Sequence, residues 1–342
     1  SSFGLVEAIK TFGKIRKTFR KVLAAFSSFA PQVLVLIDYP DFNIPLAREA
    51  RKRNIKVLYY VSPQVWAWRA KRVATIGKLV DMMAVILPFE RDLYSGTGLR
   101  CEFVGHPVMD EMAEAGAKSG SVEPGPAKAA LGLDPDRPVM VLMPGSRPHE
   151  VRKLMPVMAE VAAAMKDRFP EYQFVLPVAP NLAPRANFDA FGLPIFGSAD
   201  FHCLRGEQSV RALMAADIAV IASGTATLQA ALLGVPMVVV YKLSSFTYFA
   251  AKRIVKVKHV SLANILLDKS VRDDSGLRIM ELLQRDANSE NVIKELVRLL
   301  EDKSYRDEMI LQMERVRALF PSRGASLRVA EMVEQLSMAV TG

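Results

Sequence analysis

AVIASGTATLQAALLGVPMVVVY, from Ala219 to Tyr241, is the stretch that decides the predicted fold. The apolar run over 218–222 is typical of a buried parallel strand. The run breaks at 223–225, a helix follows, and a second all-apolar strand begins after 234–236. Continuous Val- and Ile-rich runs separated by a helix indicate a βαβ unit of a doubly wound parallel sheet.

The turn between this strand and its helix has the chemistry of a phosphate site. Backbone N–H groups that open a helix have no internal partner, and the helix dipole adds partial positive charge there. Ser223, Gly224 and Thr225 are small enough for a diphosphate to approach closely. Because such turns also occur in α/β proteins that bind nothing, an empty turn remains the alternative.

Length and composition indicate a globular chain of two domains, since 51% of the 342 residues are hydrophobic and 24% are charged. No apolar run reaches the roughly 18 residues of a membrane-spanning helix, and no signal peptide is predicted. Cys101 and Cys203 form no spacing motif, which suits a reducing compartment and buried or incidental thiols. The four histidines show no metal-ligand spacing, so the sequence predicts neither a structural metal nor a cofactor.

The net charge of +9 is unevenly distributed. Between residues 5 and 29 apolar side chains recur at helical spacing, and Lys and Arg fill much of the remaining face against a single acid, Glu7. A second basic and aromatic stretch covers 246–256. Such segments can rest on an anionic membrane surface, and the alternative is a core-packing helix with a solvated basic face. No nucleic-acid motif accompanies the charge, so a nucleic-acid partner is not predicted.

Strand and helix patterns alternate in two halves. Predicted strands cover 33–37, 57–61, 83–87, 139–143 and 174–178, and predicted helices cover 45–53, 149–168 and 210–215. We therefore predict an N-terminal Rossmann-like domain over 1–115 and a linker rich in Gly, Ser, Pro and Ala over 116–135. A C-terminal Rossmann-like domain over 136–290 is expected to face the first across a cleft. Helices over 291–342 are expected to pack back on the first domain.

Two groups of polar residues follow predicted strands, where open α/β sheets place their ligands. Asp38 and Asp41 can each serve as general base for a hydroxyl nucleophile, although helix capping by Asp41 or Asn43 is an alternative. Arg147 can hold a phosphate with two parallel hydrogen bonds, and its alternative is a surface ion pair with Glu150. A carboxylate in one half and phosphate-binding groups in the other fit transfer from a nucleotide-activated donor.

Two tryptophans, Trp66 and Trp68, follow a Ser-Pro turn and precede Arg69. They can form an apolar wall for an acyl or sugar group. The alternative is that they fill the core.

Eight strings resemble those of the bacterial lipid-A-disaccharide synthases, a family of GT-B glycosyltransferases, and they follow the family's order over about residues 4 to 285. They are DYPDFN (38–43), YVSPQVWAWR (60–69), ILPFE (86–90), FVGHPVMD (103–110), MPGSRPHEV (143–151), SGTATL (223–228), PMVVVYK (236–242) and VSLANIL (260–266). The combination of VSPQVWAWR, ILPFE and FVGHP in sequence is highly specific.

The resemblance implies a cytoplasmic enzyme of lipid A synthesis, peripheral on the inner membrane of a Gram-negative bacterium. It implies that UDP-2,3-diacylglucosamine and 2,3-diacylglucosamine 1-phosphate are joined through a β-1,6 bond with inversion and release of UDP. A homodimer is possible on this view, and no metal is expected.

The resemblance also implies roles for particular residues. Asp38, with Asp41 as the alternative, is the expected base toward the acceptor 6-hydroxyl. The residues expected at the UDP site are Ser146, Arg147, Glu150, Ser223, Gly224, Thr225, Gln229 and Asn264. The residues expected on the acceptor and acyl side are Trp66, Trp68, Arg69 and His106.

The sequence departs from the family pattern in three places. Nothing before Gly4 matches the strand and GE-x-SGD-type loop with which the family opens, so the first domain is expected to lack its first βα unit. Gln229 stands where the family usually has Glu, which predicts nucleotide affinity weakened by about 1–3 kcal/mol at most. Ala263 and Met280 each replace a usual Pro, which predicts looser loops near the nucleotide.

Two other functions are alternatives, and the expected lack of the first βα unit favours the second of them. One is a different UDP-sugar enzyme of the GT-B fold, such as a 2-epimerase. The other is a non-catalytic remnant that binds UDP or a membrane.

Overall fold

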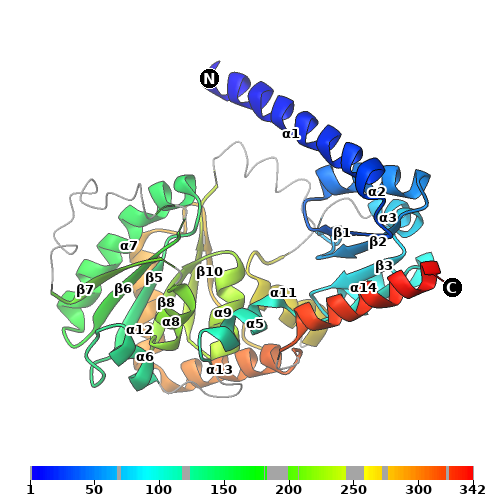
Figure 1. The fold of residues 1–342 in the computed structure, drawn as a ribbon. Coiled ribbons are helices and arrows are strands. Elements are labelled where there is room, and N and C mark those ends of the chain that lie inside the picture. Colours follow the sequence, from blue (N-terminus) through cyan, green and yellow to red (C-terminus); the bar gives the residue numbers. More distant parts are fainter. Residues whose placement is uncertain are drawn as a thin grey trace. The chain divides into compact units, whose positions relative to one another are not determined.

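The computed structural model describes residues 2–67, 71–117, 124–180, 182, 199–206, 208–243, 258–271, 276–320 and 323–341. The chain divides into two compact units, and each is built on one parallel sheet (Figure 1). The first unit contains residues 1–107 and 323–342, and the second contains residues 108–322. The predicted α/β class with two parallel-sheet domains is confirmed.

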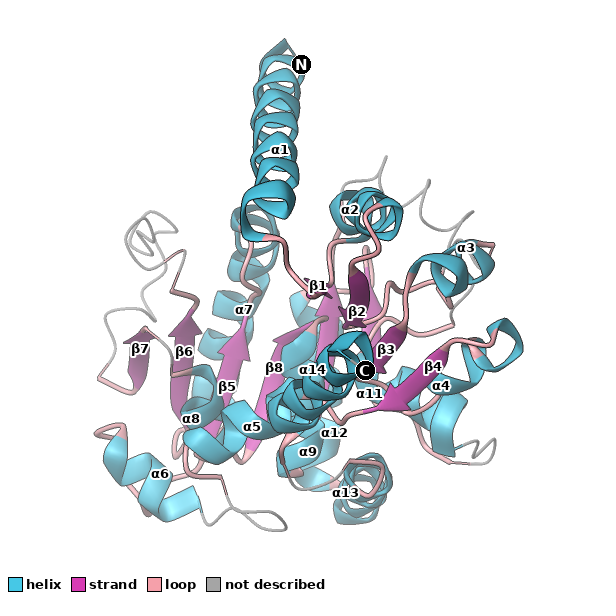
Figure 2. Cartoon of the chain, turned by 45° about the vertical axis from the view of Figure 1, so that its right-hand side comes forward, coloured by secondary structure: helices cyan, strands magenta, loops and turns pink. Residues whose placement is uncertain are grey.

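The first unit has a four-stranded sheet in the order β1-β2-β3-β4 (Figure 2). The strands are β1 (Val33–Ile37), β2 (Lys56–Tyr60), β3 (Met82–Val85) and β4 (Arg100–Phe103). The helices are α1 (Ser2–Phe29), α2 (Pro40–Lys52), α3 (Arg72–Leu79), α4 (Glu90–Leu93) and α14 (Ala325–Thr341), with a 3-10 turn η1 at Ser95–Thr97.

Both faces of β2 and β3 are covered, which explains why these two strands are apolar at nearly every position. Along β2, Val57 and Tyr59 join the core that packs under α1 and α2. Leu58, between them, points to the other face and joins Met332 of α14. Successive side chains of a strand point to opposite faces, so a continuous apolar run is needed where both faces are buried.

The second unit has a six-stranded sheet in the order β10-β9-β8-β5-β6-β7. The strands are β5 (Val139–Met143), β6 (Gln173–Val178), β7 (Phe201–Arg205), β8 (Ile218–Ala222), β9 (Met237–Tyr241) and β10 (Glu281–Leu283). The helices are α5 (Pro107–Glu114), α6 (Pro124–Ala130), α7 (Pro148–Arg168), α8 (Ser209–Met214), α9 (Thr225–Leu233), α11 (Leu262–Leu266), α12 (Ser289–Glu301) and α13 (Lys303–Arg317). A π-helical turn, η4 (Leu267–Val271), continues α11.

The βαβ unit of the opening stretch is confirmed as β8, α9 and β9. β8 pairs in parallel with both β5 and β9, and all five of its residues are buried. The carboxyl ends of β5 and β8 are therefore neighbours, and so are the two turns that follow them and lead into α7 and α9. This pairing brings the two predicted phosphate sites together.

Three local features differ from the sequence predictions. The helix expected over 45–53 begins at Pro40, whose fixed φ suits the first helical position. The sequence also predicts a short strand and turn over 103–107, whereas the strand, β4, already ends at Phe103. β7 and β10 were not predicted, since β7 contains His, Cys and Arg and β10 has only three residues.

The C-terminal segment 291–342 is divided between the two units. Helix α14 packs on β1 and β2 in the first unit. Helix α12 packs on α7 and β9, and α13 packs on α9, in the second unit. The whole segment was expected on the first domain, and this expectation is corrected because the apolar residues of α12 and α13 complete the core of the second sheet.

Candidate functional site

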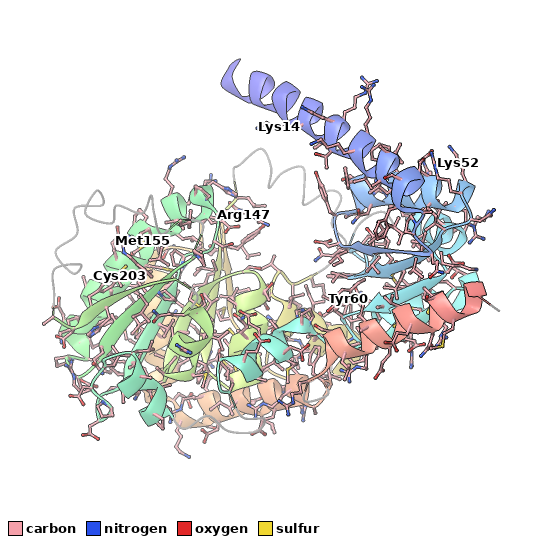
Figure 3. The ribbon with its side chains drawn as sticks, viewed as in Figure 1. Lys14, Lys52, Tyr60, Arg147, Met155 and Cys203 are labelled. Atoms are coloured by element: carbon pink, nitrogen blue, oxygen red, sulfur yellow. The ribbon has the colours of Figure 1, made fainter. Side chains whose placement is uncertain are left out.

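The β5–α7 turn presents Arg147 at the carboxyl end of the second sheet (Figure 3). Gly145 has φ +106°, and a Cβ atom there would lie 2.5 Å from Glu150 Oε2, so only glycine lets Glu150 fold under the turn. Glu150 Oε2 accepts the backbone N–H of Arg147 at 3.2 Å, and Oε1 accepts from Arg147 Nη1 at 3.1 Å. The ion pair offered as an alternative role of Arg147 is therefore present. The remaining guanidinium donors stay available, and the side chain is 68% exposed.

The β8–α9 turn is fixed by Ser223. Its backbone N–H donates to Val240 O at 3.1 Å, and its Oγ donates to Val260 O at 2.7 Å. Both hydrogens of Ser223 are used in these two bonds, and its role as a direct phosphate donor stays a prediction. Helix geometry leaves the N–H groups at the start of α9, from Gly224 onward, without internal partners. No protein atom would meet a Cβ at Gly224, so a ligand can come close to this backbone.

A pocket of about 410 Å³ lies over these two turns, within the range of natural ligand sites. It contains all but one of the residues predicted for the UDP site. Those residues are Ser146, Arg147, Glu150, Ser223, Gly224, Thr225 and Gln229. The structure therefore brings the two predicted phosphate-binding turns into one site.

Asn264 is the exception, because it is fully buried and does not line the pocket. Its Nδ2 donates to Ile279 O and to Glu281 Oε1, both at 2.8 Å, and its Oδ1 accepts from Ile279 N at 3.0 Å. These bonds make Asn264 an internal cross-link between α11 and the segment that leads to β10, and its place near the nucleotide stays a prediction.

Glu281 is the centre of that cross-link, and sequence reasoning did not identify it. Its carboxylate accepts from the backbone N–H groups of Val260 and Ser261, at 2.9 and 3.0 Å, and from Ser261 Oγ at 2.7 Å. His259 Nδ1 lies 3.6 Å away. Burial by itself would raise the pKa of Glu281, but the hydrogen bonds from His259, Ser261 and the backbone outweigh it and lower the pKa. Since Val260 also accepts from Ser223, this carboxylate fixes the loop that anchors the β8–α9 turn.

Glu111 is a second site residue that no sequence pattern indicated. It lies on α5, lines the same pocket, and accepts a hydrogen bond from Gln229 Nε2 of α9 at 3.1 Å. The two residues are 118 positions apart, so only the folded unit reveals the pair.

In the first unit, Asp38 stands at the carboxyl end of β1 in a strained backbone conformation. Asp38 and Tyr39 have φ values of +47° and +41°, and the neighbouring Val61 has +65°. Such values cost on the order of 1–3 kcal/mol each and cluster at functional sites. The Asp38 carbonyl accepts from Asn43 Nδ2 at 2.7 Å and from Tyr59 Oη at 2.6 Å, which holds the turn. The Asp38 side chain remains exposed.

The helix-capping alternative for this turn is not observed. Tyr39 is the N-cap of α2, and no side chain accepts from the helix start there. Asp41 instead lies in the first turn and pairs with Arg72 at 3.0 Å, and its side chain is 65% exposed. Asp38 therefore keeps its assignment as the leading candidate base, and Asp41 is the alternative.

Trp66 is anchored by a buried carboxylate in the first unit. Its Nε1 donates to Glu90 Oε1 at 3.1 Å, and its ring packs edge-to-face on Phe89 at 5.3 Å. Burial raises the pKa of Glu90 to about 7. Trp66 is half-buried, so it is neither a fully exposed apolar wall for an acyl or sugar group nor a fully buried core residue. Trp68, Arg69 and the basic stretch over 246–256 lie outside the described residues.

His106 is 6% exposed, and burial lowers its pKa to about 4. The imidazole is therefore neutral at physiological pH. It can act on the predicted acceptor side through hydrogen bonds but not as a cation.

Two negative findings apply to the described part of the chain. No helix there is both long and apolar enough to cross a membrane. No group of His, Cys, Asp and Glu within those residues is placed to hold a metal ion.

Comparisons with known proteins agree with this architecture and these motifs. Residues 1–332 match the family model described as lipid-A-disaccharide synthetase. The lipid-A-disaccharide synthase of Geobacter sulfurreducens is 39% identical over 334 residues, covering 97% of this chain and 82% of that protein. The enzyme of the same name from Nitrosococcus oceani is 39% identical over 311 residues, covering 90% and 75%.

Solved structures with a similar fold are more distant in sequence. The Neisseria meningitidis UDP-GlcNAc 2-epimerase bound to UDP-GlcNAc superposes with a TM-score of 0.61 at 12% identity, covering 94% of this chain and 81% of that one. The S. aureus MnaA–UDP structure gives 0.62 at 13% identity, covering 94% and 80%. At this identity the likeness shows the fold alone, two parallel-sheet α/β domains of the GT-B type.

The family match over residues 1–332, together with relatives 39% identical over most of the chain, determines the assignment. This chain belongs to the lipid-A-disaccharide synthase family, glycosyltransferases that make the disaccharide of lipid A.

Proposed function

We propose that this chain joins UDP-2,3-diacylglucosamine to 2,3-diacylglucosamine 1-phosphate, forming a β-1,6 disaccharide 1-phosphate with inversion and releasing UDP. Membership of the family supports the overall reaction. The observation that supports a UDP-sugar as the donor is the pocket of about 410 Å³, which is lined by both Arg147 and the start of α9. Both groups favour a diphosphate, and they come from neighbouring strands.

The diphosphate of UDP is the leaving group in this reaction, so negative charge grows on it as the bond to the sugar breaks. The N–H groups of Gly224 and Thr225 and the dipole of α9 favour that charge. Arg147 adds a full positive charge in a planar fork that matches two phosphate oxygens. Glu150 orients this fork through its bond to Nη1. These groups are already in position, so stabilising the charge costs little reorganisation.

Asp38 is the proposed base for the acceptor. Its carboxylate takes the proton of the acceptor 6-hydroxyl while that oxygen bonds to C1 of the donor sugar and the C1–O bond to UDP breaks. Attack opposite to the leaving group inverts the anomeric centre. Ile37 and Tyr39, on either side of Asp38, are 59% and 54% exposed. Exposed apolar side chains beside the base suit an acceptor that carries acyl chains.

Replacing Arg147 by Ala is expected to weaken UDP binding by about 10- to 100-fold, because hydrogen bonds to charged groups contribute roughly 1.5–3 kcal/mol. Isothermal calorimetry with UDP measures the change. Arg152→Ala is the matched control, since Arg152 is an exposed arginine on the same helix that does not line the pocket. Equal UDP affinity in the Arg147→Ala protein and the unmodified protein would contradict the proposed site.

We also propose that the protein works at the cytoplasmic face of the inner membrane, held there partly by α1. From residue 13 to residue 29 this helix contains no acid, and its apolar side packs on α2 through Phe19 and Phe26. Lys14, Lys17 and Lys21 are exposed on its outer side (Figure 3 labels Lys14). Such a basic face is attracted to anionic lipid by about 1 kcal/mol per charge near the surface. A homodimer stays a prediction.

Replacing Lys17 and Lys21 together by Gln is expected to weaken binding to vesicles of phosphatidylglycerol and phosphatidylethanolamine by about 30-fold at low salt. Vesicle sedimentation measures this loss. Lys294 and Lys303, exposed lysines on α12 and α13, provide the control when they are replaced in the same way. If both double variants bind as the unmodified protein does, α1 is not the membrane-binding element.

A further inference from the structure

Glu90 is a buried acid of the first unit, and the proposed transfer reaction gives it no role. It is 1% exposed and is the first residue of α4. Its Oε2 accepts the backbone N–H of Leu87 at 3.1 Å, and its Oε1 accepts from Trp66 Nε1 at 3.1 Å. Both oxygens are therefore committed, one to the turn that begins α4 and the other to an indole. Because moving a carboxylate out of water is costly, this second bond calls for a reason.

The contact between Glu90 and Trp66 lies at the carboxyl edge of the first sheet. β1, β2 and β3 are parallel neighbours (Figure 2). Asp38 directly follows β1, the segment with Trp66 follows β2, and Glu90 follows β3. The carboxyl ends of parallel strands meet at one edge, where open α/β sheets place their ligands. The contact therefore belongs to the edge that carries the proposed base.

Two links tie the segment after β2 to the segment after β3. In the first, Ser62 Oγ and Tyr94 Oη form a hydrogen bond of 2.8 Å, and both residues are buried. The second is the bond from Trp66 to Glu90, and here the indole is only half-buried, with its ring packed edge-to-face on Phe89. Since the first link already fastens the two segments, the second is left to set the direction of an indole that a ligand can reach.

An indole held in a fixed direction suits a sugar. Its flat face is apolar, and a pyranose ring has a face of C–H groups that packs against such a surface. A side chain whose direction is already set also spares the ligand the cost of ordering it.

We propose that Glu90 is a positioning residue for the acceptor, because it holds the Trp66 indole as the surface against which the acceptor glucosamine ring lies. This inference rests on the proposed transfer reaction and extends it. Glu90 acts through Trp66 and touches no substrate.

The link also predicts that acceptor binding depends on pH. The ionised carboxylate accepts both bonds, whereas in the protonated form one oxygen becomes a donor that faces an N–H group. Burial raises the pKa of Glu90 to about 7. Tyr94 at the end of α4 and Cys101 on β4 lie near it, and burial raises the pKa of both to about 12, so they stay neutral. Arg91, next to Glu90 on α4, keeps its charge. The acceptor KM is therefore expected to rise as the pH falls through about 7.

The test is steady-state kinetics of UDP release by the unmodified protein and by Glu90→Gln, with the acceptor varied at saturating donor. The amide of Gln has one acceptor oxygen, so it cannot replace both bonds. The acceptor KM is expected to rise by about 10-fold, while kcat and the donor KM stay within about 3-fold, which is the pattern of lost acceptor binding. Glu90→Gln should also lose the pH dependence that Glu90 causes. The acceptor phosphate titrates near pH 6 as well, but it is the same in both proteins.

Trp66→Phe tests the other side of the contact. It keeps an aromatic ring without the N–H and should raise the acceptor KM about as much as Glu90→Gln. The double variant should be within about 2-fold of either single variant, because both substitutions break one contact. Tyr94→Phe is the matched control, since it removes a buried hydroxyl from the first link. It should lower the urea midpoint of unfolding and leave the acceptor KM within about 2-fold.

Fluorescence gives a readout that is independent of turnover. The chain has two tryptophans, so Trp66 is the sole one in a Trp68→Phe background. Its emission should titrate with a midpoint near pH 7, and adding Glu90→Gln should abolish that titration.

The results that would overturn the inference are distinguishable from failure of the proposed function. If the unmodified protein transfers sugar and Glu90→Gln leaves the acceptor KM unchanged, or Tyr94→Phe raises it equally, the positioning role fails and the proposed function stands. If Glu90→Gln does not fold, an unchanged acceptor KM in Trp66→Phe is enough to overturn the role. If the unmodified protein releases no UDP with the acceptor present, the proposed function fails together with the inference.

Discussion

Replacing Asp38 by Asn is expected to lower the rate of sugar transfer by about 100- to 10,000-fold, the range that a general base contributes. Binding of UDP should be unchanged, because the pocket for UDP is built from the second unit alone. Asn suits this test because it tolerates the left-handed conformation, and Asp38 has a φ of +47°. The bonds from Asn43 and Tyr59 go to the backbone carbonyl of residue 38, so the substitution leaves them in place.

Asp41→Asn is the matched control for Asp38→Asn. It removes an exposed ion pair with Arg72 that contributes at most about 1 kcal/mol to stability, and transfer should stay within a few-fold of normal. Measurements of UDP release and of UDP affinity on both variants separate catalysis from binding. Normal transfer by Asp38→Asn, with loss of transfer in Asp41→Asn, would assign the base to Asp41 instead.

Replacing Glu281 by Ala is expected to destabilise the second unit by about 3–5 kcal/mol, because several buried donors lose their acceptor together. The donors are the N–H groups of Val260 and Ser261, Ser261 Oγ and Asn264 Nδ2. Any folded protein that remains should bind UDP more weakly, since the loop that holds Ser223 Oγ is no longer fixed. Urea unfolding and UDP calorimetry measure the two effects.

A graded series keeps this prediction testable if Glu281→Ala does not fold. Ser261→Ala removes one donor to Glu281 and the N-cap of α11, so a smaller loss of about 1–2 kcal/mol is expected. Glu314→Ala changes an exposed glutamate on α13 and should have little effect on the free energy of unfolding.

The stabilising effect of Glu281 is also expected to depend on pH. Because the folded pKa of Glu281 is lowered, its contribution to the stability of the second unit is present above pH 4.5 and is lost as the pH falls below that value. A change of less than 1 kcal/mol for Glu281→Ala would contradict the network.

The sequence predicted best those features that are encoded locally. The all-apolar runs of β5, β8 and β9 are long, continuous and bounded by turn residues, and their strand positions are confirmed. Parallel pairing of β5 with β8 then makes neighbours of the two turns predicted to hold phosphate. Because both sides of these strands are buried, each is a continuous apolar run, and such runs can be recognised in the sequence alone.

Features that depend on distant contacts were not predictable. Neither Glu111 nor Glu281 belongs to a pattern that signals a site, and their partners are known only from the fold. Asn264 was assigned to the nucleotide by resemblance, although its amide is fully used inside the unit. The hydroxyl of Ser223 was assigned to phosphate for its residue type, but a carbonyl 37 residues away takes its hydrogen. Residue type indicates which bonds a side chain can make, and the fold decides which it does make.

The most direct test of the account is to mix the purified protein with UDP-2,3-diacylglucosamine and follow UDP release with and without 2,3-diacylglucosamine 1-phosphate. The account predicts UDP release that requires the acceptor and forms one disaccharide 1-phosphate for each UDP. It also predicts that UDP-GlcNAc, which lacks acyl chains, is not consumed. Consumption of UDP-GlcNAc without an acceptor, or failure to release UDP from the acylated pair, would contradict it.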